Sequence, residues 1–120
     1  MLFRIYGLRR AGDTHIFLIG QTHQSLQRRK EKHIAFARAM LDRGFRTPKT
    51  MMIMQALQSG GVEIIQLDEF EAVPEYARNR DGSRGFAHSS QYVIDRERCW
   101  QAVYLYFQGG PLVIDGKLYE

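Results

Sequence analysis

Residues 4–33 constrain the fold of this chain more than any other stretch. They form two short strand-like runs, a polar turn, and then a basic segment with helical spacing. Leu2–Leu8 alternates apolar and polar residues, and Thr14–Gln21 has an almost continuous apolar centre, so each is predicted to be a strand. Because only a short turn, Arg9–Asp13, separates them, we expect an antiparallel hairpin followed by a helix.

Cap and stop signals predict three helices. A serine or threonine before an apolar-periodic run accepts hydrogen bonds from the first turn, and glycine ends a helix because it adopts the left-handed conformation. The expected helices run from Ser25 to about Arg43 with Gly44 as the stop, from Pro48 to about Gln58 after Thr47, and from Ser89 or Ser90 to about Phe107.

The remaining segments are shorter and more polar. Val62–Leu67 is predicted to be a third strand, and Pro111–Tyr119 a closing hairpin around Asp115-Gly116. The acidic segment Asp68–Tyr76 is expected to be a short helix or turn, and Asn79–Gly85 a mobile loop. A chain of 120 residues can bury one core, so residues 1–120 are predicted to form a single domain.

The composition is that of a folded, soluble protein, with 44% hydrophobic and 25% charged residues. No apolar run approaches the roughly 20 residues needed to cross a bilayer, and the N-terminus lacks the features of a signal peptide. The single cysteine, Cys99, excludes an internal disulfide framework. We therefore expect a cytoplasmic protein without a membrane partner.

Charge is distributed unevenly along the chain. Residues 1–50 carry eleven lysines and arginines against three acidic residues, whereas the remainder carries six against ten. A basic half beside an acidic half indicates a surface that binds a polyanion, with an asymmetric solvated surface as the alternative. Arg28, Lys30 and Lys32, in the first predicted helix, are the candidate nucleic-acid contacts.

Three ionisable residues occur at positions where an apolar side chain is expected. Arg29 follows Leu26 by three residues and His33 lies one turn further, so both share the inward face of the first helix. Glu97 lies on the apolar face of the third helix. A structural histidine beside a buried Arg–Glu ion pair would explain them, but three such residues in a basic domain also indicate a catalytic site, because buried charge is costly unless it is paired or used.

This set of side chains is suited to phosphodiester hydrolysis. Arg29 offers several donors for phosphate oxygens, Glu97 offers a carboxylate for one Mg²⁺, and Tyr6 and His33 can relay a proton. The other three histidines have no metal-ligand spacing, and the sequence contains no CxxC motif.

At these residues the sequence resembles the GIY-YIG endonuclease superfamily, in particular its small phage and homing-type members. Arg4-Ile5-Tyr6 is followed after eleven residues by Leu18-Ile19-Gly20. Arg29-x-x-x-His33 and Glu97-x-x-Trp100 then come in the order that the family pattern requires. The resemblance covers nearly the whole chain.

The resemblance implies a fold, an activity and a site. The fold would be α/β (α+β), with a central three-stranded antiparallel sheet flanked by helices. The protein would be a DNA endonuclease that requires Mg²⁺ (or Mn²⁺). Tyr6 would position the attacking water, Arg29 would hold the scissile phosphate, His33 would assist proton transfer, and Glu97 would bind the metal. Gly20 and His23 would support the site.

Three departures from the family pattern leave two hypotheses open. Leu18 stands where the second motif has tyrosine, Arg4 stands where the first has glycine, and no asparagine follows Asn79. The first hypothesis is an active nuclease. The alternative is a catalytically weakened or inactive module that binds nucleic acid or protein. Specificity would come from loops, from a homodimer or from a partner.

Overall fold

The computed structural model of the protein describes residues 1–88 and 90–120, without the side chains of residues 77, 78 and 86–88. Its centre is a mixed sheet of five strands in the order β3-β1-β2-β6-β7. The strands are β1 (Leu2–Arg10), β2 (Ile16–Thr22), β3 (Val62–Glu71), β6 (Leu112–Ile114) and β7 (Lys117–Tyr119).

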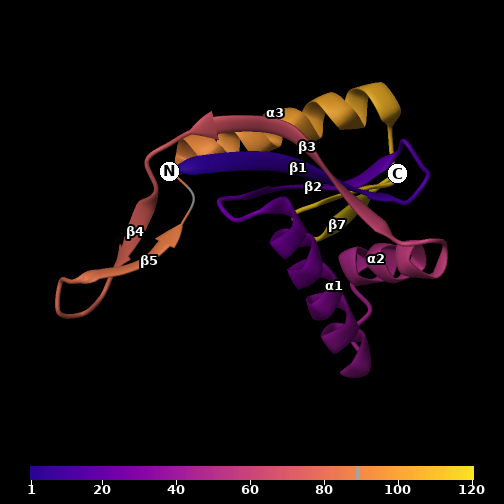
Figure 1. The fold of residues 1–120 in the computed structure, drawn as a ribbon, viewed down its shortest axis with the longest axis horizontal. Coiled ribbons are helices and arrows are strands. Elements are labelled where there is room, and N and C mark those ends of the chain that lie inside the picture. Colours follow the sequence, from indigo (N-terminus) through magenta and orange to yellow (C-terminus); the bar gives the residue numbers. More distant parts are fainter. Residues whose placement is uncertain (89) are drawn as a thin grey trace.

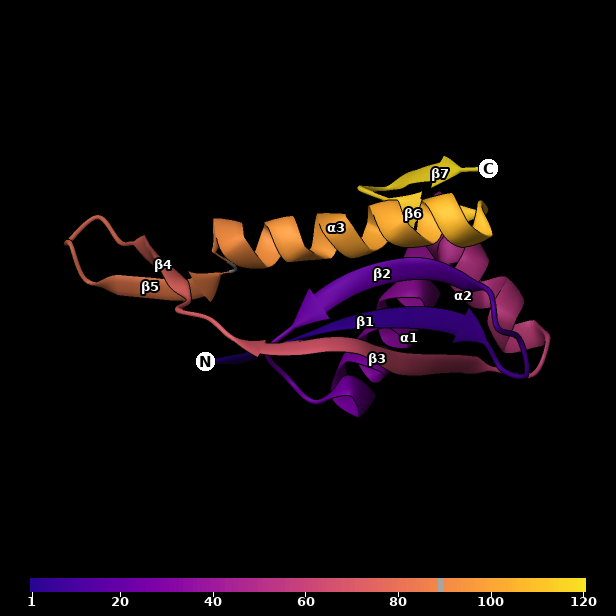
Figure 2. The same ribbon diagram turned by 90° about the horizontal axis from the view of Figure 1, so that it is seen from above.

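Helices cover both faces of this sheet (Figures 1 and 2). One face packs against α1 and α2, and the other packs against α3. Side chains alternate along β1, so that Tyr6 and Leu8 enter the core on the first face and Ile5 enters the core on the second. The helices are α1 (Leu26–Asp42), α2 (Pro48–Gln58) and α3 (Gln91–Gln108).

The mixed α+β class is confirmed, but the three-stranded sheet is wrong. The predicted strands β3, β1 and β2 do form an antiparallel core. The C-terminal hairpin then extends the sheet, because β6 pairs with β2 in parallel at Leu18 and Val113. Leu112 and Val113 are almost fully buried, and adding β6 to the β2 edge is what buries them.

The predicted closing hairpin is confirmed. Ile114 pairs with Lys117, which leaves Asp115 and Gly116 as a two-residue turn. Both turn residues have positive φ, 50° and 78°, as a type I′ hairpin requires.

For the middle of the chain, one prediction is wrong, and the other holds only for residues 79–83, which form a turn between two strands. The acidic segment after Leu67 is not a helix, because β3 continues to Glu71 and pairs with the N-terminal end of β1. The segment predicted to be a mobile loop belongs to a hairpin of β4 (Glu75–Arg78) and β5 (Arg84–His88), which projects away from the sheet (Figure 1). Its turn is held by Asn79, which donates to the Ser83 hydroxyl, and by Asp81, which accepts from the Ser83 backbone N–H.

The helix caps follow the sequence closely. Ser25 and Thr47 accept hydrogen bonds from the backbone of the first turns of α1 and α2. Ser90 precedes α3 in an extended conformation, and Ser89 lies outside the described residues. Within the described parts of the chain, no helix is long and apolar enough to cross a bilayer.

Candidate active site

The Tyr6 hydroxyl joins the first strand to the first helix at the centre of the candidate site. It lies 2.6 Å from His33 Nε2 and accepts a hydrogen bond of 3.0 Å from Arg29 Nε. Tyr6 and His33 are 1% and 4% exposed, so this contact is buried at the wall of the cavity that both residues line. The sequence spacing therefore brings Arg29 and His33 to one hydroxyl group, as expected.

His33 is held as a neutral imidazole. Burial, followed by the charges of Lys49 and Arg29, lowers its pKa from 6.5 to about 3. The Tyr6 hydroxyl proton has His33 Nε2 as its hydrogen-bond acceptor among the described contacts, so we assign the imidazole proton to Nδ1. Burial raises the pKa of Tyr6, and Arg29 opposes that rise. At neutral pH, Tyr6 is thus a protonated hydroxyl that donates to a neutral base.

Gly20 leaves the space that the Tyr6 ring occupies. The two residues pair directly across β1 and β2. A Cβ atom added at Gly20 would lie 2.6 Å from Tyr6 Cζ and closer still to the hydroxyl oxygen. The supporting role predicted for Gly20 therefore has a steric basis.

Glu97 reaches the same cavity from α3. Its Oε1 accepts a hydrogen bond of 3.2 Å from Gln101 Nε2, which also contacts the backbone oxygen of Ile19 on β2 at 3.3 Å. Burial, followed by the charge of Asp115, raises the pKa of Glu97 from 4.5 to about 7. Glu97 is therefore a half-buried carboxyl that faces a second carboxylate, and no Arg29–Glu97 ion pair occurs among the described residues.

An ion-paired contact fixes α3 immediately before Glu97. Arg96 and Trp100 both donate to the carboxylate of Asp68 on β3, with Trp100 Nε1 at 3.1 Å. The Arg96 guanidinium also lies over the Phe70 ring, 4.3 Å from its centroid. Because these contacts flank Glu97 on the same helix, they fix the part of α3 that carries Glu97 against β3.

One open cavity of about 210 Å³ is lined by Tyr6, Gly20, Arg29, His33 and Glu97. Sequence reasoning did not assign four of its polar residues to the site, one of which is Gln21 on β2. Lys49 enters from α2, Gln101 from α3, and Asp115 from the β6–β7 turn. Asp115 stands out in the sequence as part of Asp115-Gly116, but the hairpin turn fully accounts for that pair, so the sequence assigns it no role in the site. Lys49 and Gln101 carried no sequence signal, because their positions depend on how the helices pack.

Leu18, in place of the second-motif tyrosine, is also on this wall. It is 6% exposed and packs in the core beneath α1 and α2. The cavity therefore has one tyrosine hydroxyl, that of Tyr6, among its lining residues.

Other predicted residues lie outside this cavity. His23 is exposed and meets the Phe3 ring edge-on, with 6.0 Å between centroids. Arg28 and Lys30 lie on α1 without lining the cavity, and Lys32 lines a neighbouring one. The structure thus gathers the four predicted catalytic residues and leaves His23 apart.

Glu97 and Asp115 are the residues of this cavity that could hold a single divalent cation. No group of three or more His, Cys, Asp or Glu side chains with metal-binding geometry occurs within the described residues. Glu97 and Asp115 do line one cavity, and the charge of Asp115 makes an ionised Glu97 unfavourable unless a cation is present. Mg²⁺ suits such a pair, because it commonly keeps several waters and takes one or two carboxylates plus substrate phosphate.

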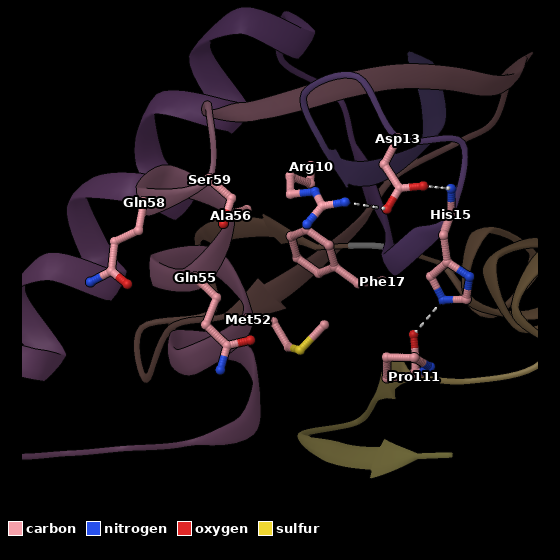
Figure 3. Close-up of a pocket in the computed structure, with 10 residues that line it drawn as sticks. All are labelled: Arg10, Asp13, His15, Phe17, Met52, Gln55, Ala56, Gln58, Ser59 and Pro111. Carbon is pink, nitrogen blue, oxygen red and sulfur yellow. Dashed lines mark hydrogen bonds and ion pairs between the residues drawn. The ribbon is translucent and has the colours of Figure 1, made fainter.

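A separate cavity of about 440 Å³ lies between the β1–β2 turn, α2 and Pro111 (Figure 3). Its charged side chains and its histidine are paired. Arg10 pairs with Asp13 at 3.5 Å, Asp13 accepts from the backbone of His15, and His15 Nε2 donates to the Pro111 oxygen at 2.9 Å. These contacts tie the hairpin turn to the C-terminal segment.

Comparison of the chain with protein-family models, with curated proteins and with solved structures finds no match.

Proposed function

We propose that the protein is a metal-dependent DNA endonuclease that hydrolyses phosphodiester bonds. The observation that carries this proposal is the buried Tyr6 hydroxyl, which contacts both Arg29 and His33 in a cavity that Glu97 also lines. The basic N-terminal half of the chain supplies the charge that a DNA backbone requires.

Arg29 is the residue proposed to bind the scissile phosphate. Its Nε is engaged by Tyr6, and the guanidinium has no carboxylate partner among the described residues. Its other N–H groups are thus available for phosphate oxygens, whose negative charge grows as water attacks. Because Arg29 Nε donates a hydrogen bond to Tyr6, the Tyr6 hydroxyl would lie beside a phosphate bound by Arg29.

Tyr6 and His33 form the proposed proton path. As the oxygen of the attacking water bonds to phosphorus, its proton passes to Tyr6 Oη and the Tyr6 proton passes to His33 Nε2. The bond from phosphorus to the leaving nucleoside oxygen breaks, and that oxygen takes a proton from solvent. His33 returns its proton readily, because burial disfavours the imidazolium.

Glu97 would hold the divalent ion, with Asp115 facing it across the cavity. When bound, such an ion neutralises charge on the phosphoryl and leaving oxygens. Glu97 must lose its proton to act as a ligand, so metal affinity should rise as the pH passes about 7.

Conversion of supercoiled plasmid to nicked circles tests the proposal. One site cuts one strand, so nicked circles should precede linear DNA, and a homodimer or a specificity-providing partner would be needed for concerted double-strand cleavage. We expect cleavage with Mg²⁺ or Mn²⁺ and none with EDTA. Glu97→Gln should abolish cleavage while keeping DNA affinity within about threefold, because the phosphate contacts remain.

A binding module without catalysis is the second candidate, and Leu18 in the core favours it. This alternative predicts salt-dependent DNA binding like the nuclease, but no cleavage. A wild-type protein that binds plasmid and leaves it intact with both metals would establish the second candidate and exclude the first.

A further inference from the structure

A second cavity, of about 580 Å³, adjoins the candidate active site between α1 and α2. It shares Arg29, His33 and Lys49 with the active-site cavity. Lys32 and Phe36 of α1 complete its functional wall. A ligand that continues from the scissile phosphate past Arg29 would enter this space.

The ionisable groups of this second cavity are three cations and one histidine. Arg29, Lys32 and Lys49 line it, no carboxylate is among its lining residues, and none of the three cations forms an ion pair within the described residues. Burial and the nearby charge of Arg29 lower the pKa of Lys49, so the two cations oppose one another. An anion between them would relieve that repulsion.

His33 adds a buried donor without a partner. Its side chain lines the second cavity, its residue is 4% exposed, and Nδ1 has no hydrogen-bond partner among the described residues. Since Nε2 accepts from Tyr6, Nδ1 carries the proton. Buried donors without partners are rare in folded proteins, so this one indicates a ligand or solvent acceptor at the site.

The ring of Phe36 positions the ammonium group of Lys49, which lies on α2. Phe36 is an apolar residue of α1, yet its side chain is 54% exposed. The Lys49 ammonium lies 5.3 Å from the centroid of its ring. The Phe36 ring thus holds the Lys49 ammonium at the cavity, a role that a carboxylate partner commonly has for a lysine.

We propose that this cavity is a second phosphate subsite, in which Lys49 and Lys32 bind the phosphate next to the scissile one in a nucleic-acid strand. The inference rests on the proposed function, which places the scissile phosphate at Arg29. Phosphate is the anion favoured here because lysine and arginine donors bind it throughout nucleic-acid recognition. The two cavities share Arg29, His33 and Lys49, so they adjoin one another. The ligand proposed to occupy both is therefore two consecutive phosphates of one strand.

Short thymidine oligonucleotides test this subsite without any cleavage. The probes are dTpT with one phosphodiester, dTpTpT with two, and dTpTpT with one linkage replaced by a neutral methylphosphonate. Affinity is measured by NMR titration in EDTA. For the wild type, the second charged linkage should strengthen binding about tenfold, and a methylphosphonate should remove that gain. This wild-type series needs no variant to fold.

Lys49→Gln should reduce the gain to less than about twofold, whereas Lys49→Arg should retain it. Arg38→Gln is the matched control on α1, and it should leave the gain unchanged because Arg38 is exposed and does not line the cavity. Inorganic phosphate distinguishes a free anion from a strand. If inorganic phosphate alone shifts the resonances of α1 and α2 and a second linkage adds nothing, the strand subsite is refuted.

The two proposals fail in different ways. A wild type that cleaves plasmid but shows no gain from a second linkage would refute the subsite alone. A gain that Lys49→Gln erases, in a protein that never cleaves DNA, would refute the nuclease and support the subsite. An equal gain in the wild type and Lys49→Gln would show that Lys49 does not bind the second phosphate.

Discussion

The cavity of Figure 3 and the candidate active site both contain cationic, histidine and carboxyl side chains, yet they differ in how these are paired. In the first, Arg10 pairs with Asp13, and His15 bonds to a backbone oxygen. In the second, Arg29 has no carboxylate partner among the described residues, and His33 Nδ1 is unbonded.

This difference separates structure from function. The paired polar groups have a structural role, since each satisfies the hydrogen-bonding needs of the other and together they stabilise a turn. Cations without a carboxylate partner, and a half-buried carboxyl near a second carboxylate, are unfavourable by themselves and become favourable when phosphate and metal bind. The predictions below compare changes within the candidate site with matched changes elsewhere.

The largest effect is expected from Tyr6→Phe. The change removes the hydroxyl that Arg29 and His33 both contact, and with it the proposed proton path. The single-turnover rate of plasmid nicking with Mg²⁺ should fall by about 10²–10⁴-fold. Tyr104→Phe is the matched control, because the Tyr104 ring packs against Trp100 on α3, away from the cavity. A rate for Tyr6→Phe equal to that of the control would exclude Tyr6 from catalysis.

Gly20→Ala should displace the Tyr6 hydroxyl without removing it. A misplacement of about 1 Å costs roughly 100-fold in rate. Gly7→Ala is the control on the adjacent strand, where the added Cβ would lie 2.7 Å from the flexible end of Ile16 and away from the hydroxyl. Nicking rates and melting temperatures of both variants check this. Gly7→Ala should lose stability but keep its rate; the reverse pattern would contradict the steric account.

Glu97→Gln should change how stability depends on pH. The folded pKa of Glu97, about 7, is above its ordinary value of 4.5, so its contribution to stability is full below pH 4.5 and is lost as the pH rises through 7. His33, with a pKa of about 3, acts in the opposite direction between pH 3 and 6.5, so only the difference between variant and wild type isolates Glu97.

We therefore expect the stability advantage of Glu97→Gln to grow by up to about 3 kcal/mol from pH 4.5 to 8 in EDTA. Urea denaturation at several pH values measures it. Addition of Mg²⁺ should narrow the advantage at pH 8, because the ion stabilises the wild-type carboxylate. A constant difference in stability between Glu97→Gln and the wild type across this pH range would show that the pKa of Glu97 is not raised in the folded protein.

The smallest effect is expected from Lys32→Ala. Loss of one phosphate contact should reduce the slope of log affinity against log salt concentration by about 0.9. Arg38→Ala is the control, because Arg38 is exposed on the same helix but lines neither cavity of the site. Equal slope changes would indicate a diffuse basic surface rather than a defined phosphate path.

Local signals predicted more of this molecule than its long-range contacts. The hairpin, the caps at Ser25 and Thr47, and the inward face of Arg29 and His33 follow from neighbours in sequence. The β2–β6 pairing joins Leu18 to Val113, and no local pattern specifies such a parallel contact. Lys49 reaches the site only because α2 packs beside α1, and Phe36 is exposed because that helix does not cover it.

The most direct test of the central claim is a comparison of Arg29→Ala with Arg10→Ala in single-turnover plasmid nicking. Arg29 has no carboxylate partner among the described residues and lies beside Tyr6, whereas Arg10 is paired with Asp13. The account predicts a loss of about 10²–10³-fold for Arg29→Ala. Arg10→Ala should stay within about twofold of the wild type, because its ion pair is exposed. Equal losses in the two variants, or no loss in either, would contradict it.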